Sequence, residues 1–199
     1  MGRVRRTFSR AELESFRDAV VPDLLPTRPG QELRLLFVGI NPGLWTAATQ
    51  THFAHPGNRF YPALLQAGVV TERIDPAAGL TEDERDRLRD RGIGITNLVH
   101  RATAKASELD TAELKEGGAA LTALVERLRP RVVAVAGITA YRTAFGRPKA
   151  VMGRQPDQLG GAELWVVPNP SGLNAHETIP SLATAYGEVA RAAGLLVDS

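Results

Sequence analysis

Polar and aromatic side chains follow a continuous apolar run near residue 40. The run Leu35–Val38 is typical of a parallel strand that is covered on both faces. Asn41 stands in the Pro- and Gly-containing turn after it, and Phe53 lies in the loop beyond. Loops at the carboxyl ends of parallel strands are where open α/β sheets bind their ligands. An amide followed by an aromatic ring therefore predicts a pocket that binds a flat polar ring by its edge and its face.

The same loop carries His52 and His55, whose spacing would allow both to reach one metal ion. No third ligand is placed nearby, so a role in loop structure or in ligand contact is favoured over a metal site. The chain has no cysteine, which excludes disulfides, cysteine nucleophiles and cysteine-held iron–sulfur clusters. We expect neither a metal nor a cofactor.

Other common chemistries of α/β proteins lack their sequence signatures in this chain. There is no G-x-x-x-x-G-K-[ST] phosphate loop and no G-x-S-x-G nucleophile elbow. Gly39 and Gly43 do not complete the G-x-G-x-x-G pattern of a dinucleotide site. Ser171, which lies between proline and glycine, is a poor candidate for a nucleophile. Amides, backbone N–H groups and aromatic rings remain as the chemical groups of the predicted site.

A second polar turn has the same setting as the first. The apolar run Leu164–Val167 ends at Pro168, and Asn169 then opens the sequence NPSGL; Asn97 follows a third run, GIGIT. Right-handed crossovers place the carboxyl ends of parallel strands at one edge of a sheet. We therefore expect Asn41, Asn97 and Asn169 to lie at the same edge.

The elements that must position these turns alternate between strands and helices, which predicts a three-layer αβα fold with a mainly parallel sheet of about four strands. The expected strands are 33–39, 92–96, 132–136 and 164–167. The expected helices are 9–20, 59–67, 81–91, 110–128, 139–145 and 178–193, and residues 40–58 should form a long loop. Gly117 and Gly118 lie inside one expected helix, which indicates close packing or a kink there.

Length and composition fit one globular domain. The chain has 199 residues, of which 43% are hydrophobic, enough for a substantial core. We expect residues 1–10 to form a flexible basic tail and residues 11–199 a single domain. No apolar run approaches the ~20 residues of a membrane span, and a cytoplasmic, nucleoid-associated location is expected. The formal charge is only +2, so a nucleic-acid face would need local clusters of basic residues. Candidates in or near loops are Arg59, Arg101, Lys105, Lys149 and Arg154.

Four segments together resemble one enzyme family. They are GINPGL (39–44), FAHPGNRF (53–60), ITNLV (95–99) and VPNPSGL (167–173). In this order and spacing they resemble the mismatch-specific uracil-DNA glycosylases and their thymine-DNA glycosylase relatives, and the likeness extends over roughly residues 33–193. The resemblance implies a monomeric DNA repair enzyme that flips a mispaired or damaged base out of double-stranded DNA and hydrolyses its N-glycosidic bond.

The resemblance also implies roles for individual residues of the first motif. Asn41 would hold the attacking water through its side-chain carbonyl, and Phe53 would stack on the flipped base. The implied base-binding positions are Ile40, Gly43, Thr46, Phe53 and Asn169. Thr46 falls beside C5 of the base, where its branched side chain would crowd a thymine methyl group, so uracil is expected to be preferred.

In the second motif the resemblance implies contact with DNA. Leu173 would fill the gap left by the flipped base, as apolar wedges do in other DNA-binding proteins. Pro170, Ser171 and Gly172 would pack against the DNA backbone. Ala175 stands where the bacterial pattern has an arginine, so the preference for the opposing base is left open.

Alternatives remain for both the residues and the function. Asn41 could merely stabilise its turn, and Phe53 or Leu173 could be ordinary core side chains. Asp86 or Asp90 could assist Asn41, although surface helix charges are favoured for both. At the level of function, the alternatives are a nucleoside or nucleotide hydrolase and a DNA-lesion binding module without catalysis.

Overall fold

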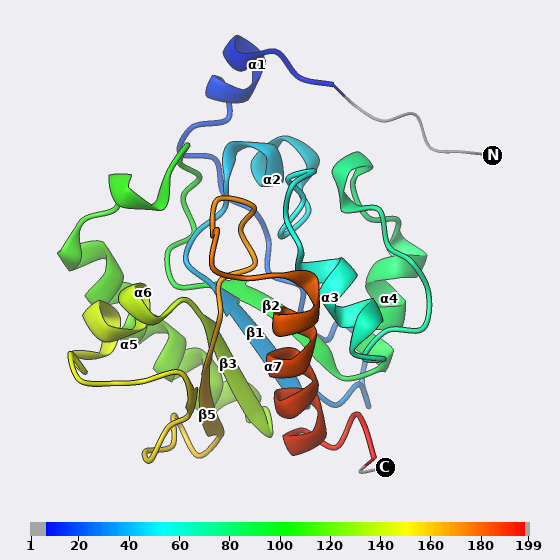
Figure 1. The fold of residues 1–199 in the computed structure, drawn as a ribbon, viewed down its shortest axis with the longest axis vertical. Coiled ribbons are helices and arrows are strands. Elements are labelled where there is room, and N and C mark those ends of the chain that lie inside the picture. The colour runs from blue at the N-terminus through cyan, green and yellow to red at the C-terminus, as the bar shows by residue number, and fades with distance from the viewer. Residues whose placement is uncertain (1–6, 198–199) are drawn as a thin grey trace.

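The computed structural model describes residues 7–197, which form an α/β fold around a five-stranded sheet (Figure 1). The strands are β1 (Leu35–Gly39), β2 (Ile93–Asn97), β3 (Val132–Ala136), β4 (Gly153–Arg154) and β5 (Glu163–Val167). The α-helices are α1 (Arg10–Glu14), α2 (Leu44–Thr49), α3 (Phe60–Gln66), α4 (Glu82–Asp90), α5 (Thr111–Leu128), α6 (Ile138–Phe145) and α7 (Ile179–Ala192). Short 3₁₀ helices span Pro76–Ala78 and Ala106–Glu108. None of the helices within residues 7–197 has the length and apolarity needed to cross a membrane.

The strand order is β2-β1-β3-β5-β4, and all neighbouring pairs are parallel except β4 with β5. Strands β1, β2 and β3 are buried along their whole length, as the continuous apolar runs predict. The parallel pairing brings the carboxyl ends of β1, β2, β3 and β5 to one edge. This confirms the predicted sheet and adds a short antiparallel edge strand.

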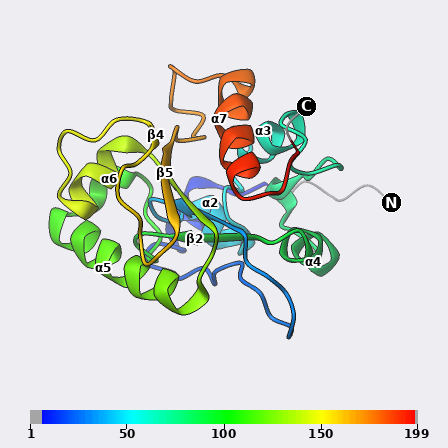
Figure 2. The ribbon, with the colours of Figure 1, turned by 90° about the horizontal axis from the view of Figure 1, so that it is seen from below.

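Alternating side chains of each strand supply two separate cores, which makes the fold three-layered. Leu35 and Phe37 belong to the core beneath α3, α4 and α7, whereas Leu36 and Val38 belong to the core beneath α5 and α6. Figure 2 shows α5 and α7 on opposite sides of the sheet. The predicted αβα architecture is therefore confirmed.

The two glycines inside α5 mark close packing. A Cβ atom added at Gly117 would lie 2.2 Å from the carbonyl oxygen of Leu98, and one at Gly118 would lie 2.7 Å from that of Ala144. Neither contact leaves room for a side chain. The predicted close packing is confirmed, and it holds α5 against both α6 and the chain segment that leaves β2.

Three local predictions differ from the structure. Residues 44–49, expected in a loop, form α2, whose two threonines disfavour the helix when taken alone. The first helix ends at Glu14 instead of continuing to residue 20, because Asp18 adopts a positive φ of 62° and Val20 pairs with Arg101. The strand β4 has only two residues, too few for a detectable pattern.

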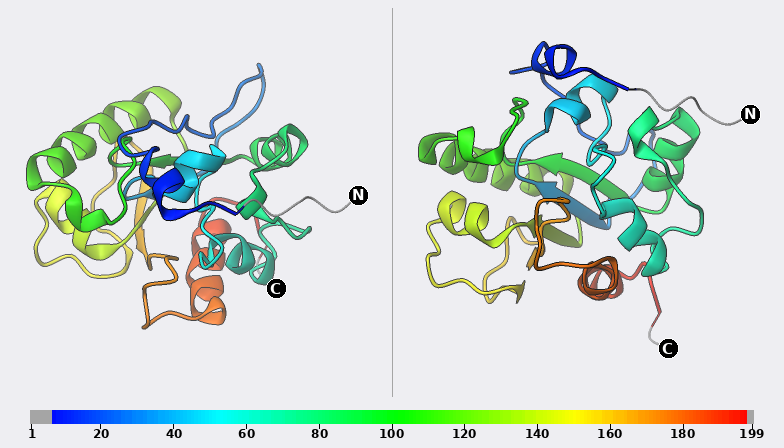
Figure 3. Two further views of the ribbon diagram at one scale, coloured as in Figure 1. Left: turned by 90° about the horizontal axis from the view of Figure 1, so that it is seen from above. Right: turned by 45° about the horizontal axis from the view of Figure 1, so that its top comes forward.

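The amino-terminal segment lies over α2, beyond the end of the sheet (Figure 3). Phe8 contacts Trp45 edge-on, with 5.0 Å between ring centroids, and Ser9 caps α1 in the predicted capping box. Residues 1–6 of the expected basic tail lie outside the described residues.

Candidate active site

The two asparagine-bearing turns lie at the same edge of the sheet, on either side of the start of α6. A Cβ atom added at Gly137 would lie 3.4 Å from Ile40 Cδ1 and 3.9 Å from Asn169 Cβ. Asn97 is the last residue of β2, next to Gly39 in the parallel register. The predicted meeting of the three polar turns is therefore confirmed.

The amide of Asn41 is held in one orientation by its neighbours. Its Nδ2 lies 2.8 Å from Thr103 Oγ1, 3.1 Å from the carbonyl oxygen of Arg101 and 3.2 Å from that of Pro42. Thr103 in turn donates its hydroxyl proton to the carbonyl of Lys105. All the hydrogens of the amide point to protein acceptors, while Oδ1 accepts no hydrogen bond from residues 7–197. The half-buried Asn41 thus presents an oriented acceptor oxygen.

Phe53 lies beside the end of β1 in an unusual backbone conformation. Its φ is 55°, and its ring stacks on that of Phe60 with 4.2 Å between centroids. Phe53 Cζ would lie 3.3 Å from a Cβ atom added at Gly39, so only glycine lets the ring approach the strand this closely. The side chain packs against the core but is only partly buried, so these core contacts leave part of Phe53 exposed. Within residues 7–197, the backbone N–H groups of Ile40 and Phe53 have no acceptor.

Asn97 is a site residue to which the sequence reasoning assigned no role. Its Oδ1 lies 2.4 Å from the position of a Cβ atom on Gly39, and the Phe53 ring borders the same position. Its Nδ2 lies 3.1 Å from His52 Nδ1, which turns the amide oxygen toward Gly39. An amide directly after a buried strand, the signal that marked Asn41, is also present here.

His52 is a structural residue of the site. It is 6% exposed, and its Nε2 lies 2.9 Å from the carbonyl oxygen of Pro22. Because the Asn97 amide donates to Nδ1, the ring hydrogen is on Nε2 and is donated to Pro22. Burial lowers the pKa of His52 below its ordinary value, so the ring is neutral at pH 7. Both ring nitrogens are used within the protein.

His55 is exposed and accepts a hydrogen bond from the backbone N–H of Gly57 through Nδ1, at 3.0 Å. The two loop histidines therefore have separate structural contacts. No cluster of three or more His, Cys, Asp or Glu side chains suited to a metal ion occurs in the described part of the chain.

The second turn projects from the rim. Asn169 Oδ1 accepts from the N–H of Ser171 at 3.0 Å, and Asn174 Nδ2 donates to the carbonyl of Asn169 at 3.1 Å. Leu173 follows and is 90% exposed. A core position for Leu173 is thereby excluded. An isolated, fully exposed leucine between polar residues is a suitable group for insertion into a partner.

The remaining predicted base contacts lie on α2. Gly43 precedes this helix at the exposed surface, and no atom lies within 4 Å of an added Cβ, so a ligand can approach its backbone. Thr46 is 6% exposed, and its Oγ1 lies 3.4 Å from the N–H of Ala54. The side chain of Thr46 is thus fixed between α2 and the loop that carries Phe53.

The structure excludes two possible contributions to the site. Asp86 and Asp90 cannot assist Asn41, because α4 ends just before the amino end of β2 and both carboxylates pair with Arg28, in agreement with the favoured interpretation as surface helix charges. Arg59, a candidate phosphate contact, is not available to a DNA phosphate, since its guanidinium donates to backbone carbonyls of the second turn. In both cases the charged side chains have partners that are distant in sequence.

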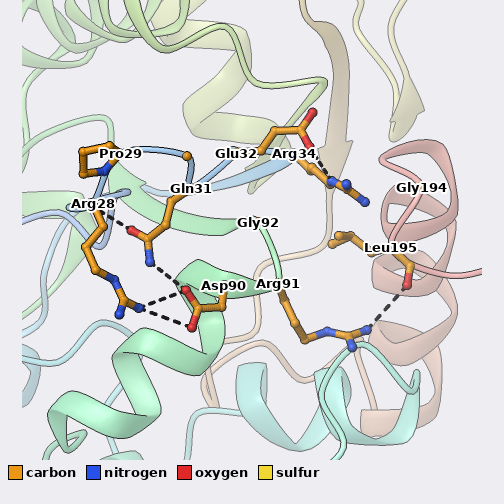
Figure 4. A pocket seen from close by; sticks show the side chains of 11 residues that line it. Arg28, Pro29, Gln31, Glu32, Arg34, Asp90, Arg91, Gly92, Gly194 and Leu195 are labelled. Carbon is orange, nitrogen blue, oxygen red and sulfur yellow. Dashed lines mark hydrogen bonds and ion pairs between the residues drawn. The ribbon is translucent and has the colours of Figure 1, made fainter.

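A cavity of about 690 Å³ lies away from the rim, at the amino ends of the strands (Figure 4). Arg28 and Gln31 point to Asp90, and Arg34 pairs with Glu32. Arg91 follows the carboxyl end of α4, where a positive charge stabilises the helix dipole. The positive charges of these arginine side chains are therefore balanced within the protein, by carboxylates or by the dipole of α4.

Comparison with known proteins agrees with this arrangement. A solution NMR structure of a candidate uracil DNA glycosylase from Methanosarcina acetivorans has the same fold, with a TM-score of 0.56. The two chains are 17% identical, and the match covers 86% of this chain and 98% of the other. The sequence profile described as the uracil DNA glycosylase superfamily matches residues 27–188. This match extends over most of the domain, so the chain belongs to the uracil DNA glycosylase superfamily.

Proposed function

We propose that this protein is a mismatch-specific uracil DNA glycosylase of the thymine-DNA glycosylase type, acting as a monomer on double-stranded DNA. The observation that carries the proposal is the fixed amide of Asn41, whose Oδ1 is free at the rim between the two polar turns. Superfamily membership supports glycosidic bond hydrolysis as the reaction. The protein would leave an abasic site in the repaired strand.

Base binding in this proposal uses groups that gather around Gly39. A flipped pyrimidine would stack on Phe53, while the free N–H groups of Ile40 and Phe53 donate to its carbonyl oxygens. Asn97 Oδ1 can accept a hydrogen bond from the N3–H of uracil. The hydrogen bonds from the N–H groups of Ile40 and Phe53 strengthen as negative charge develops on the oxygens of the departing base.

The chemical step needs a water molecule near C1′ of the flipped nucleotide. The bond between C1′ and the base nitrogen breaks with both electrons leaving on the base, and the sugar becomes oxocarbenium-like. Water held by Asn41 Oδ1 then adds to C1′ and loses a proton to solvent. An amide is a poor general base, so Asn41 contributes orientation and the enzyme is expected to be slow.

Substrate choice is assigned to Thr46. Its side chain is buried and held against Ala54, so it cannot readily move away from a methyl group at C5 of the base. Uracil should therefore be excised in preference to thymine.

The proposal is tested with a labelled duplex that contains one G·U pair, incubated with protein and then treated with alkali. Strand scission at the uracil is expected from the native protein and should be lost with Asn41→Ala. Cleavage of free deoxyuridine without any need for duplex would select the nucleoside hydrolase. Binding to the duplex without abasic product, across uracil, thymine and damaged-base substrates, would select a lesion-binding module.

A further inference from the structure

Arg59 lies in the segment FAHPGNRF and connects it to the projecting second turn. Its Nη2 donates to the carbonyl of Ser171 at 2.6 Å and to that of Asn174 at 2.7 Å, and its Nη1 donates to the carbonyl of Glu177. The Nε of the same side chain is buried and has no acceptor within residues 7–197. One guanidinium thus spans the whole bend that carries Leu173.

Backbone contacts support the same junction. The N–H of Arg59 donates to the carbonyl of Pro170 at 3.0 Å. A Cβ atom added at Gly172 would lie 2.6 Å from the carbonyl oxygen of Gly57, so the second turn lies directly on residues 55–58. The other hydrogen bonds around Leu173 remain within residues 169–174 and cannot fix its position relative to the rest of the protein.

We propose that Arg59 is a positioning residue that holds the second turn so that Leu173 points outward toward DNA. This inference rests on the proposed function and adds a component to it. A guanidinium presents five N–H donors in a rigid planar fork, whereas a lysine has one ammonium and cannot span three carbonyls with the same geometry. Without this side chain the turn would keep its internal hydrogen bonds but lose its fixed orientation.

Loss of the Arg59 side chain should impair cleavage only of substrates whose base must be extracted from a stack. A wedge is needed when the uracil is paired within a duplex, because opening the helix costs free energy that the inserted leucine offsets. A uracil that already lies unpaired in a mismatched bubble needs much less help. Loss of Arg59 should therefore separate the two substrates, whereas a defect in the chemical step would affect both equally.

The experiment compares Arg59→Lys with native protein on a G·U duplex and on the same uracil in an unpaired bubble. We expect kcat/KM on the duplex to fall about tenfold, equivalent to about 1.4 kcal/mol, with a change of less than about twofold on the bubble. Arg28→Lys is the matched control, because Arg28 also binds a neighbouring segment but lies at the opposite end of the sheet. This variant should keep native activity on both substrates. Thermal unfolding of each variant establishes that it is folded.

A second readout does not depend on catalysis. A duplex with 2-aminopurine beside 2′-fluorodeoxyuridine reports unstacking by fluorescence, while the fluorine prevents bond cleavage. The signal should be reduced by Arg59→Lys and by Gly172→Ala, which displaces the same turn through the contact with Gly57. The double variant of Arg59→Lys with Leu173→Ala should be no worse than Leu173→Ala alone, because both changes remove the same insertion.

Equal losses on duplex and bubble, or additive effects of Arg59→Lys and Leu173→Ala, would overturn the proposal for Arg59. A native protein that unstacks the duplex but forms no abasic product would instead refute the glycosylase function and leave Arg59 as a positioning residue for DNA binding. The two failures are therefore distinguishable.

Discussion

The two polar turns at the rim are held in different ways. Asn41 is tied to the segment after β2, both through its own amide and through the backbone hydrogen bond from Thr103 to Pro42. The turn before Leu173 bonds mainly to itself and is attached to its neighbours through Arg59 and a glycine contact. One turn is part of the sheet edge, and the other is a projection that is attached through Arg59 and through the contact between Gly172 and Gly57.

This difference corresponds to two physical tasks. A group that places a water molecule must be held to within a fraction of an ångström, because small displacements reduce the rate steeply. A group that enters DNA must project beyond the rim and keep its direction while the base is extracted. The rigid turn therefore suits the chemical step, and the projecting turn suits extraction of the base.

The largest expected effect comes from removing the oriented oxygen of the rigid turn. Asn41→Ala should lower kcat by about 100-fold or more on both paired and unpaired uracil, because water is no longer placed near C1′. Single-turnover cleavage measures the chemical step, and titration of a 2′-fluorodeoxyuridine duplex measures binding. Binding should be nearly unchanged. A loss of similar size in binding would show that Asn41 belongs to recognition and would remove the contrast between the turns.

The rigid turn could be largely predicted from sequence, whereas the reason for its rigidity could not. An apolar strand followed by Asn41 and a second one followed by Asn169 are local patterns, and parallel pairing brings their ends together. The two closest acceptors of the Asn41 amide lie about 60 residues away, at Arg101 and Thr103. No local pattern indicates such a contact.

The errors have the same origin. Arg59 is only a candidate phosphate contact from sequence, because a basic residue near a loop is typical of a DNA-binding surface, but its acceptors are more than 110 residues away. The helix α2 was missed because its six residues are too few to show a helical period. Asn97 has the same local pattern as Asn41, but the orientation of its amide depends on the contact with His52, 45 residues away.

The second-largest expected effect tests whether the chemical step depends on the fixed orientation of the Asn41 amide. Thr103→Val keeps the shape of the side chain but removes the shortest of the three contacts of Asn41 Nδ2, so the amide is held less firmly by the two carbonyls that remain. We expect kcat to fall about tenfold, which is smaller than the loss in Asn41→Ala because the oxygen is still present. The conservative control Thr103→Ser retains the hydroxyl and should recover most of the activity. If valine and serine variants behave alike, Thr103 has only a packing role.

A smaller effect is expected at the junction between the rigid turn and α2. Thr46→Ala should raise the thymine-to-uracil activity ratio by about tenfold, since one methyl group in a tight pocket is worth about 1–3 kcal/mol. The ratio of kcat/KM on G·T and G·U duplexes measures it. Thr49→Ala, a nearby threonine of the same helix, is the control. An unchanged ratio in Thr46→Ala would show that C5 of the base lies elsewhere.

The smallest expected effect is a pH dependence of the free energy of unfolding. It arises from His52, which supports Asn97 at the rim. Burial lowers the pKa of His52, so the unfolded chain binds a proton more readily than the native protein does. The free energy of unfolding should therefore decrease as pH falls below the ordinary value of 6.5 toward the lowered native pKa. Urea unfolding between pH 7.5 and about 5 measures this slope.

His52→Gln should flatten the slope, while His55→Gln, in the same loop but exposed, should keep the native profile. Protonation of His52 also removes the acceptor for Asn97 Nδ2 and releases the amide that faces Gly39. Cleavage of unpaired uracil should thus weaken only as pH falls through the lowered native pKa of His52, whereas insertion of Leu173, read by 2-aminopurine fluorescence, should not. Parallel losses of both signals would mean that the two turns do not act separately.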